Sequence, residues 1–486
     1  MSAAPHGRRP LHDNYGGICK VTEKNFRTLQ DLVDNTPDLV SYFYNDTPGP
    51  YSRTRRNDVP AEHTNWRDEQ RAWRETACIF DQSHHMPELF VRGRDALKLL
   101  NYIGVNSLAN LKPGIAKQFI ACNHQGYMIG ECVLHDLGND TYELISGRPL
   151  QSWVRYHAAT GGYDVEVVAD EATPDNPSGR RINFRYGMDG PNARKIFEEV
   201  IEDKMPEIKF FHTAKVKIAG VECLALRHGM AGHMGVEISG PYDDRDKVLD
   251  AILKVGEKYG LKRGGSKAYF SAQYESGWIA HPLPAIYTAE DLRGYREWLP
   301  GDEWEARFQL AGSFVSKSIE DYYVNPLDMG YGRIISFDHD FIGREALQRM
   351  MDQPHRNKVT LVWNKEDVLK VYASLLEEGT PYKFMDMPVA DFGFPPRDEV
   401  RSKDGRLIGL STLTGYTVNE NAFLSLATID APDAIIGSEV EVVWGEPNGG
   451  SRKKRVERHR QINIRATVAP APYAQFVQQK KRETVA

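Results

Sequence analysis

Glycines recur at every third position in the stretch RHGMAGHMGVE, which runs from Arg227 to Glu237. Glycine-rich loops bind phosphate when they lead into a helix, because the free N–H groups of the helix then face the anion. Here the flanking segments VECLALR and VEIS are both strand-like, so no helix begins at the loop. Two interpretations remain. The loop is either a flexible hairpin, or a segment whose glycines let a flat ligand come close to the backbone, with Glu237 at the start of the strand that follows.

A second stretch that could carry chemistry is SKAYFSAQYESGW, from Ser266 to Trp278. Its alternation predicts a strand, on which Lys267, Tyr269 and Ser271 share one face. A lysine beside a tyrosine can balance the charge of the phenol. On spacing alone, the pattern favours a structural tyrosine next to a solvated lysine.

The histidines do not form a metal-binding pattern. His84 and His85 are neighbours in FDQSHHM, and adjacent residues on a strand point to opposite faces. His228 and His233 flank the glycine loop, but no third ligand lies near them in the sequence. We therefore expect no metal, and we expect one histidine of the pair to be buried and hydrogen-bonded.

A basic run, SRKKRVERHR, extends from Ser451 to Arg460. It follows the turn EPNGG and precedes the strand-like QINIRATV, so the pattern predicts a solvated edge strand. The net charge of the whole chain is -6, which argues against a nucleic acid or an anionic membrane as a partner.

Length and composition describe an ordinary globular protein. The 486 residues are 41% hydrophobic and 26% charged, which predicts two to four domains. No stretch approaches the roughly 20 apolar residues of a membrane helix, and the first residues lack the apolar segment of a secretory signal. The five cysteines are scattered and odd in number, so they predict no disulfide framework. A cytoplasmic location is expected.

The elements that must position these residues are strand–turn–helix units. ELFVRG followed by RDALKLLNYI is one such unit, and two more begin at Asn183 and Val236. Before the first unit, NWRDEQRAWRETA predicts a helix capped by Asn65. The stretch from Gln118 to Ser146 predicts a strand meander. Together these patterns predict an α+β core built from ferredoxin-like half-motifs.

Four regions follow from these patterns. Residues 1–60 form a leader, residues 61–355 form a core of two α+β subdomains, and residues 471–486 form a tail. Between core and tail, residues 356–470 contain short strands such as VTLVW, AFLSLATI and EVEVVWG, separated by turn residues. That spacing predicts a separate small β domain.

The order of the motifs resembles the glycine-cleavage aminomethyltransferase, or T-protein, family. FDQSHHM is similar to the family's FDxSHM stretch, RHGMAGHMGVEI to its folate loop, and DFIGREAL to its Phe-Ile/Val-Gly-x-x-Ala-Leu signature. The resemblance spans roughly residues 65–470. It implies a three-domain α+β cloverleaf, with ferredoxin-like domains, a C-terminal small β domain and tetrahydrofolate in a central channel.

One branch of the family fits better than the aminomethyltransferases. Those enzymes carry an Asp-Asp pair in the meander, whereas GYMIGECVLHD has Gly130 and Glu131 there. The tetrahydrofolate-dependent aromatic O-demethylases, which act on vanillate, 3-O-methylgallate or syringate, are similar over nearly the whole chain. The motifs that carry this resemblance include NWRDEQRAWR, FDQSHHM, RHGMAG, ESGWI, PLPAIYT, IEDYYVNP and FDHDFIGR.

The resemblance implies a role for each matching residue. Tyr269 acts on the methoxy oxygen of the substrate, and Glu237 binds the pterin of the folate. Further folate contacts fall on Gln118, Lys267 and Trp278. The methoxylated aromatic acid is held by Tyr42, Tyr44, Gln82, His85 and Arg148.

These residue types suit the implied reaction, in which the methyl of an aryl ether moves to N5 of tetrahydrofolate. A phenolate of pKa ~10 leaves poorly, so an acid of similar pKa at the oxygen helps by typically ~10²–10⁴-fold. Holding the reacting atoms in line contributes up to ~7–11 kcal/mol. A carboxylate suits the paired N–H donors of a pterin, and a guanidinium suits a benzoate.

Other functions remain open from the residues. The chain could be an aminomethyl- or other methyltransferase of the same fold, or a folate-binding protein without activity. The sequence does not decide among the three methoxybenzoates, and it does not predict an oligomeric state.

Overall fold

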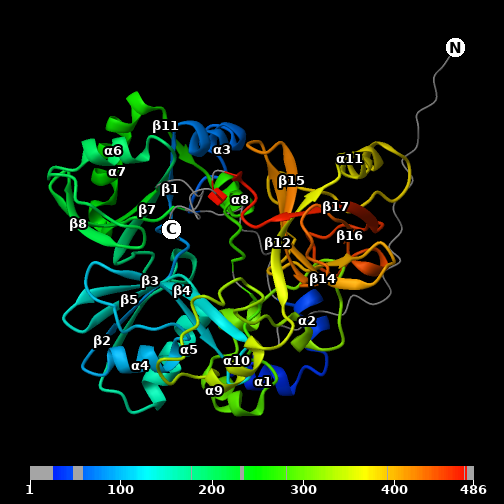
Figure 1. The fold of residues 1–486 in the computed structure, drawn as a ribbon, viewed down its shortest axis with the longest axis horizontal. Coiled ribbons are helices and arrows are strands. Elements are labelled where there is room, and N and C mark those ends of the chain that lie inside the picture. Colours follow the sequence, from blue (N-terminus) through cyan, green and yellow to red (C-terminus); the bar gives the residue numbers. More distant parts are fainter. Residues whose placement is uncertain are drawn as a thin grey trace, which may run out of the picture.

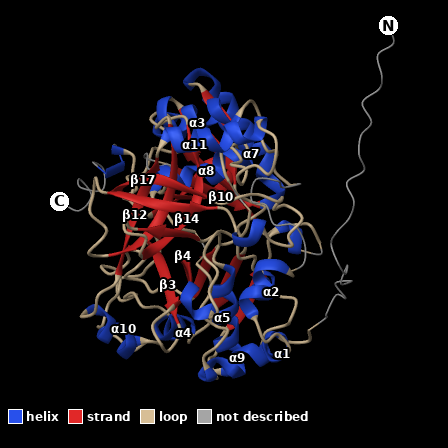
Figure 2. Cartoon of the chain, turned by 90° about the vertical axis from the view of Figure 1, so that its right-hand side faces the viewer, coloured by secondary structure: helices blue, strands red, loops and turns tan. Residues whose placement is uncertain are grey.

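Three sheets organise the chain, and Figure 1 shows them as three lobes around a common centre. In the turned view of Figure 2, strands run through the interior and most helices lie on the outside. No helix in the part of the chain that is described here has the length and apolarity needed to cross a membrane. The computed structural model describes residues 26–47, 58–176, 178–229, 235–280, 282–390, 392–475 and 477–478.

The first sheet has six strands in the order β11-β1-β7-β10-β9-β8. All neighbouring strands are antiparallel except β1 and β11. Helices α6 (Ala193–Val200) and α7 (Arg245–Gly256) bury their apolar sides on one face of this sheet. The strands are β1 (Ala77–Asp81), β7 (Asn183–Asp189), β8 (Thr213–Ile218), β9 (Val221–Leu226), β10 (Val236–Pro241) and β11 (Leu261–Gly264).

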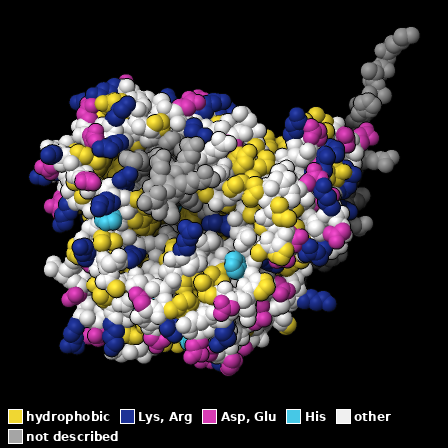
Figure 3. Space-filling view, viewed as in Figure 1, with side chains coloured by type: hydrophobic (Ala, Val, Ile, Leu, Met, Phe, Trp, Pro, Cys, Tyr) yellow, Lys and Arg dark blue, Asp and Glu magenta, His cyan; other side chains and the backbone are white. Residues whose placement is uncertain are grey.

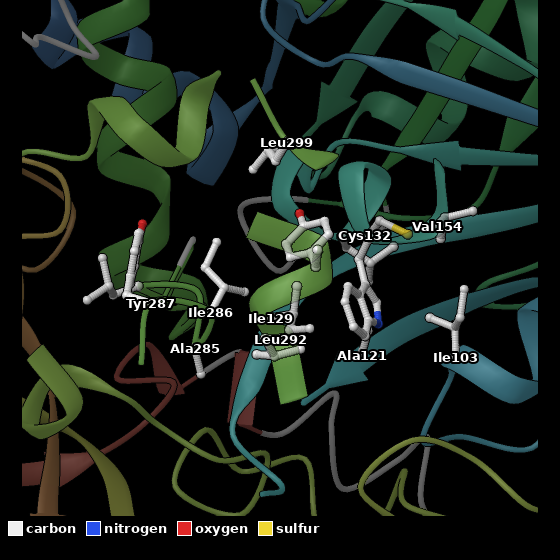
Figure 4. Close-up of a cluster of buried hydrophobic side chains, with 14 of the residues drawn as sticks. Ile103, Ala121, Ile129, Cys132, Val154, Ala285, Ile286, Tyr287, Leu292 and Leu299 are labelled. Atoms are coloured by element: carbon white, nitrogen blue, oxygen red, sulfur yellow. The ribbon is translucent and has the colours of Figure 1, made fainter. Parts of the chain in front are cut away.

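The second sheet is an antiparallel meander, β3-β4-β5, extended beyond β5 by two more antiparallel strands, in the order β3-β4-β5-β2-β6. The predicted meander is therefore confirmed. Apolar side chains of β3, β4 and α5 meet those of the 285–299 segment in a buried cluster, which Figure 4 shows in close-up. The elements are β2 (Glu88–Arg92), α4 (Ala96–Ile103), β3 (Ala116–Cys122), β4 (Met128–Gly138), β5 (Thr141–Ile145), α5 (Arg148–Thr160), β6 (Glu166–Asp170), α9 (Arg293–Trp298) and α10 (Arg344–Met351).

The third sheet closes into a six-stranded barrel, with α11 (Lys365–Ala373) against it. The prediction that the basic run is a solvated edge strand is wrong, because the run lies outside the strands of the barrel, and β17, which follows it, pairs with both β12 and β16. The run from Ser451 to Arg460 consists of turns, and Arg452 Nη2 lies 2.6 Å from Asp46 Oδ2 of the leader. The strands are β12 (Arg356–Trp363), β13 (Asp398–Arg401), β14 (Leu407–Thr417), β15 (Ala422–Asp430), β16 (Glu439–Trp444) and β17 (Ile462–Pro470).

Two short helices of the leader, α1 (Leu29–Asp34) and α2 (Leu39–Asn45), pack into the core of the second lobe. Phe43 is fully buried, and its ring centroid lies 5.1 Å from that of Tyr287. The leader is therefore part of the folded protein within its described residues, and it bridges the second sheet and the barrel.

The stretch from Ser266 to Ser276 is a helix, α8, so the prediction of a strand there is wrong. Figure 1 shows α8 at the junction of the first sheet and the barrel. Since it packs against both, nearly all of its residues are buried, and no polar face marks it as a helix. Lys267 and Tyr269 are about 200° apart around a helix, so they do not share a face as predicted.

Contacts on both sides fix α8 in place. The buried carboxylate of Glu275 accepts hydrogen bonds from Trp73 Nε1 at 3.1 Å and from Thr417 Oγ1 at 2.7 Å. The first donor lies on α3 (Trp66–Glu75), the helix predicted from the sequence and capped by Asn65. On β14, a Cβ added to Gly415 would lie 2.5 Å from the ring of Tyr274, so strand and helix approach directly.

Candidate active site

A cavity of about 150 Å³ lies where α8, the start of α5 and the turn after β1 meet. It can hold one aromatic ring, since an engineered apolar cavity of about this size binds benzene. Four of the residues predicted for the site, from three separate parts of the chain, line this cavity: His85, Arg148, Tyr269 and Trp278.

Tyr269 is held on several sides at the cavity wall. Its side chain is buried, and its hydroxyl accepts a hydrogen bond from Gln82 Nε2 at 3.4 Å. The ring centroid of His85 lies 4.9 Å from that of Tyr269, and the ring centroid of Phe80 lies 5.4 Å away. The end of β1 therefore positions the phenol that α8 presents, and Gln82 sits fully buried beside it.

The two adjacent histidines, His84 and His85, have different surroundings. Both side chains are half-buried, so neither is the buried histidine that we expected, although His84 is hydrogen-bonded. His84 Nδ1 lies 3.0 Å from Thr173 Oγ1, and His85 faces the cavity. Among the described residues, no group of three or more His, Cys, Asp or Glu is arranged to hold a metal ion.

Glu131 brings two of the predicted folate contacts together. Its carboxylate accepts hydrogen bonds from Gln118 Nε2 at 2.7 Å and from Trp278 Nε1 at 2.8 Å. Burial raises the pKa of Glu131, although these donors and the Tyr331 hydroxyl act in the opposite direction. From the sequence, Glu131 was only a departure from the aminomethyltransferase pattern. Its contacts make it an organising residue of the site.

Glu237 lies on β10 in a buried network of charges. His228 Nδ1 is 3.1 Å from Glu237 Oε1, and Arg185 Nη1 is 3.6 Å from Glu237 Oε2. Burial alone would raise the pKa of Glu237, but the hydrogen bond from His228 and the charge of Arg185 outweigh it and lower the pKa to about 2. Glu237 is therefore a buried carboxylate that stays ionised.

Arg185 connects Glu237 to the second sheet. Its Nη2 lies 2.9 Å from Glu88 Oε1 and 3.0 Å from Glu143 Oε1, and all three side chains are buried. Burial raises the pKa of Glu88 to about 7, although the charge of Arg185 acts to lower it. Burial also acts to raise the pKa of Glu143, but the hydrogen bond with His135 and the charge of Arg185 outweigh it, so this pKa is lowered. Arg185 of the first sheet therefore links Glu237 to Glu88 and Glu143 of the second sheet.

Six of the ten predicted residues do not line the cavity: Gln82, Gln118 and Glu237, whose contacts are given above, and Lys267, Tyr42 and Tyr44. Lys267 Nζ is 3.2 Å from Glu62 Oε2, because the helix turns this side chain away from Tyr269. Tyr42 packs against the rings of Phe26 and Phe43, and the Tyr44 hydroxyl donates to Gly312 O at 2.6 Å. The structure thus does not bring Lys267, Tyr42 or Tyr44 to the cavity wall.

Residues 230–234 of the glycine loop, including Gly232 and His233, lie outside the described residues. What is described is a hairpin of β9 and β10, with Glu237 opposite Leu226. The two flanks are strands, as the sequence predicted, so among the described residues no helix begins directly at either end of the loop.

The model of the GCVT N-terminal domain family matches residues 38–282, which is half of the chain. The chain belongs to the GCVT family. Syringate O-demethylase of Sphingobium sp. (strain NBRC 103272 / SYK-6) is 42% identical over 92% of this chain and 96% of its own length. Sesamin methylene transferase of Sinomonas sp. (strain No.22) is 30% identical over 85% of this chain and 90% of its own length.

The fold of this GCVT family member also agrees with a solved structure. Aminomethyltransferase T of the glycine cleavage system from Bartonella henselae superposes with a TM-score of 0.57 at 16% identity, covering 85% of this chain and 90% of that one. This confirms the T-protein-like α+β fold expected from the order of the motifs.

The stability of this GCVT family member should depend on Glu237 in acid. Folding lowers the pKa of Glu237 from 4.5 to about 2, so its contribution is complete above 4.5 and is lost as the pH falls toward 2. We expect the difference in unfolding free energy between wild type and Glu237→Gln to shrink by about 2 kcal/mol between about pH 6 and about pH 3. Urea denaturation at each pH measures it, and a difference that stays constant would contradict the assignment.

Proposed function

We propose that this protein is a tetrahydrofolate-dependent aromatic O-demethylase. It transfers the methyl of a methoxybenzoate (vanillate, syringate or 3-O-methylgallate) to N5 of tetrahydrofolate, giving 5-methyltetrahydrofolate and a phenolic acid. The observation that carries the proposal is the ring-sized cavity, in which a buried phenol, Tyr269, and a guanidinium, Arg148, line the same space. The similarity to syringate O-demethylase supports it.

Buried polar residues outside the cavity wall, with Trp278 of the wall, fit a folate. Glu237 is buried and ionised, and His228 and Arg185 leave lone pairs on both of its oxygens. Such a carboxylate can accept the ring N–H and the exocyclic amine of a pterin side by side. Gln118 and Trp278 both donate hydrogen bonds to Glu131, and they add a polar amide and an aromatic ring for stacking. When bound, tetrahydrofolate supplies the amine nucleophile and accepts the methyl.

Tyr269 serves the leaving group. Its hydroxyl donates a proton or a hydrogen bond to the methoxy oxygen as the carbon–oxygen bond breaks, and the similar acidity of two phenols makes that transfer nearly balanced. Gln82 fixes the orientation of the hydroxyl through the 3.4 Å contact. Arg148 pairs with the carboxylate of the aromatic acid and sets which ring position reaches Tyr269.

A substrate panel tests this function. The purified protein is incubated with tetrahydrofolate and each methoxybenzoate, and the products are identified by mass. We expect a catechol or gallate and 5-methyltetrahydrofolate in equal amounts, and none without the folate. Activity only on glycine-derived or dimethylsulfonio substrates would indicate another methyltransferase of the fold. Folate binding without demethylation of any methoxyarene would indicate a binding protein.

We also propose a cytoplasmic protein without a nucleic-acid partner. The four described cysteines are free and buried, which suits a reducing compartment. Figure 3 shows charged side chains of both signs interspersed over the face in view, and the net charge is -6. Neither feature is typical of a surface that binds phosphate backbones.

Replacing Glu131 by glutamine should weaken folate binding about tenfold. The amide cannot accept from every donor that the carboxylate serves, and hydrogen bonds to a charged group contribute about 1.5–3 kcal/mol each. We expect KM for tetrahydrofolate to rise and kcat to change less. The matched control is Glu222→Gln on β9, whose side chain is 73% exposed. An unchanged KM would show that Glu131 does not organise Gln118 and Trp278.

A further inference from the structure

The arginine of the cavity is already paired before any ligand enters. Arg148 is the first residue of α5 and is 9% exposed. Its Nη2 lies 2.5 Å from Glu171 Oε2, and its Nη1 lies 3.2 Å from Asp175 Oδ2. Asp175 ends the short 3₁₀ helix Thr173–Asp175 and itself lines the cavity. An anionic ligand would therefore meet a guanidinium whose two outer nitrogens face protein carboxylates.

Asp175 has a second cation within reach. Arg307 Nη1 lies 3.8 Å from Asp175 Oδ1, whereas the contact with Arg148 Nη1 is made by the other carboxylate oxygen, Oδ2. The side chains of Asp175 and Arg307 are both partly exposed, so a small movement of Asp175 toward Arg307 costs little. Arg148, in contrast, is packed at the start of a helix. Of Arg148 and Asp175, the residue that moves is therefore Asp175.

On this geometry we propose that Asp175 is a specificity-determining residue that competes with the carboxylate of the substrate for Arg148. A substrate acid binds by taking the place of Asp175 on the guanidinium, and Asp175 moves onto Arg307. A ring without a carboxylate does not displace it. The identity of the substrate in this inference rests on the proposed function. The competition itself does not, because any aromatic carboxylate that enters the cavity would meet Asp175 on Arg148.

The competition predicts opposite effects for two variants. Asp175→Asn removes the competing charge, so the dissociation constant of the methoxybenzoate should fall by about threefold to tenfold. Arg307→Gln removes the alternative partner of Asp175, so the dissociation constant should rise by a similar factor. The aldehyde of the same methoxyarene, which lacks the carboxylate, should bind all three proteins equally.

Calorimetric titration with vanillate and with its aldehyde measures these changes without turnover. Asp243→Asn is the matched control, because Asp243 is an exposed acid paired with Arg180 away from the cavity. Tighter vanillate binding to Asp175→Asn, with aldehyde binding unchanged, supports the inference. Unchanged or weaker vanillate binding, or an equal change for the aldehyde, overturns it. A wild type that binds vanillate but demethylates no methoxyarene would overturn the proposed function alone.

Discussion

Replacing Tyr269 by phenylalanine is expected to lower kcat by about 10²–10⁴-fold, because the departing phenolate then loses its proton donor. The affinity for the methoxybenzoate should stay within a few-fold of the wild type. The ring packing against His85 and Phe80 does not involve the hydroxyl, and phenylalanine preserves it. Single-turnover formation of 5-methyltetrahydrofolate, with substrate affinity measured separately, distinguishes the two quantities.

The same helix supplies a matched control for that experiment. Tyr274 is also a buried tyrosine of α8, but its hydroxyl donates to Thr414 O of the barrel at 3.0 Å. Tyr274→Phe removes one buried hydrogen bond, which costs about 1 kcal/mol of stability, and should leave kcat near the wild-type value. If Tyr269→Phe retained full turnover, or if both variants slowed equally, Tyr269 would not be the acid.

Replacing Glu237 by alanine is expected to weaken tetrahydrofolate binding by at least about thirtyfold, since truncating a buried charged hydrogen-bond partner costs 2 kcal/mol or more. Binding of the aromatic acid should change little, because Glu237 does not line the cavity. Titration of each ligand alone measures both constants.

Two further variants separate binding from folding in that experiment. Glu237→Gln keeps the shape of the side chain and should lose most of the folate affinity. Because this variant also loses the acid-sensitive stabilisation, its unfolding free energy is measured at the same pH as folate binding, and binding is compared only where both proteins are fully folded. Glu222→Ala, at an exposed position of the neighbouring strand β9, should behave as wild type. Equal losses of affinity for both ligands in Glu237→Ala would contradict the anchoring role.

Local signals in the sequence predicted much of the framework. Asn65 caps α3 as expected, with Asn65 Oδ1 accepting from Asp68 N at 3.0 Å. The meander and the strands of the barrel follow from apolar alternation between turn residues, which is a signal within each segment. The order of motifs along the chain then predicted the family, because that order does not depend on how the segments pack.

Helix α8 shows where local signals fail. Periodicity reports which face of an element meets solvent, and α8 has no such face. Ala268 to Glu275 are all buried between the first sheet and the barrel. One signal did mark the helix end: Gly277 takes the left-handed conformation, with φ of 70°, that commonly terminates helices.

The partners of the site residues could not be predicted for a related reason. Trp278 and Glu131 are 147 positions apart in the chain, and Arg185 and Glu88 are 97 apart. Only the tertiary fold brings such pairs together, so nothing in the sequence indicated which residues Glu131, Arg185 and His228 contact. The pairing of Arg148 with Asp175 is of the same kind.

The close approach of Gly415 to Tyr274 limits how this protein can be recombined with its relatives. A graft that replaced the barrel with one carrying any side chain at this position would push α8 away from β14, because the added carbon would lie 2.5 Å from the ring of Tyr274. Such a chimera could keep every residue of the cavity and still present Tyr269 at the wrong depth. The barrel, although it contributes little to the cavity wall, therefore sets the position of the Tyr269 hydroxyl.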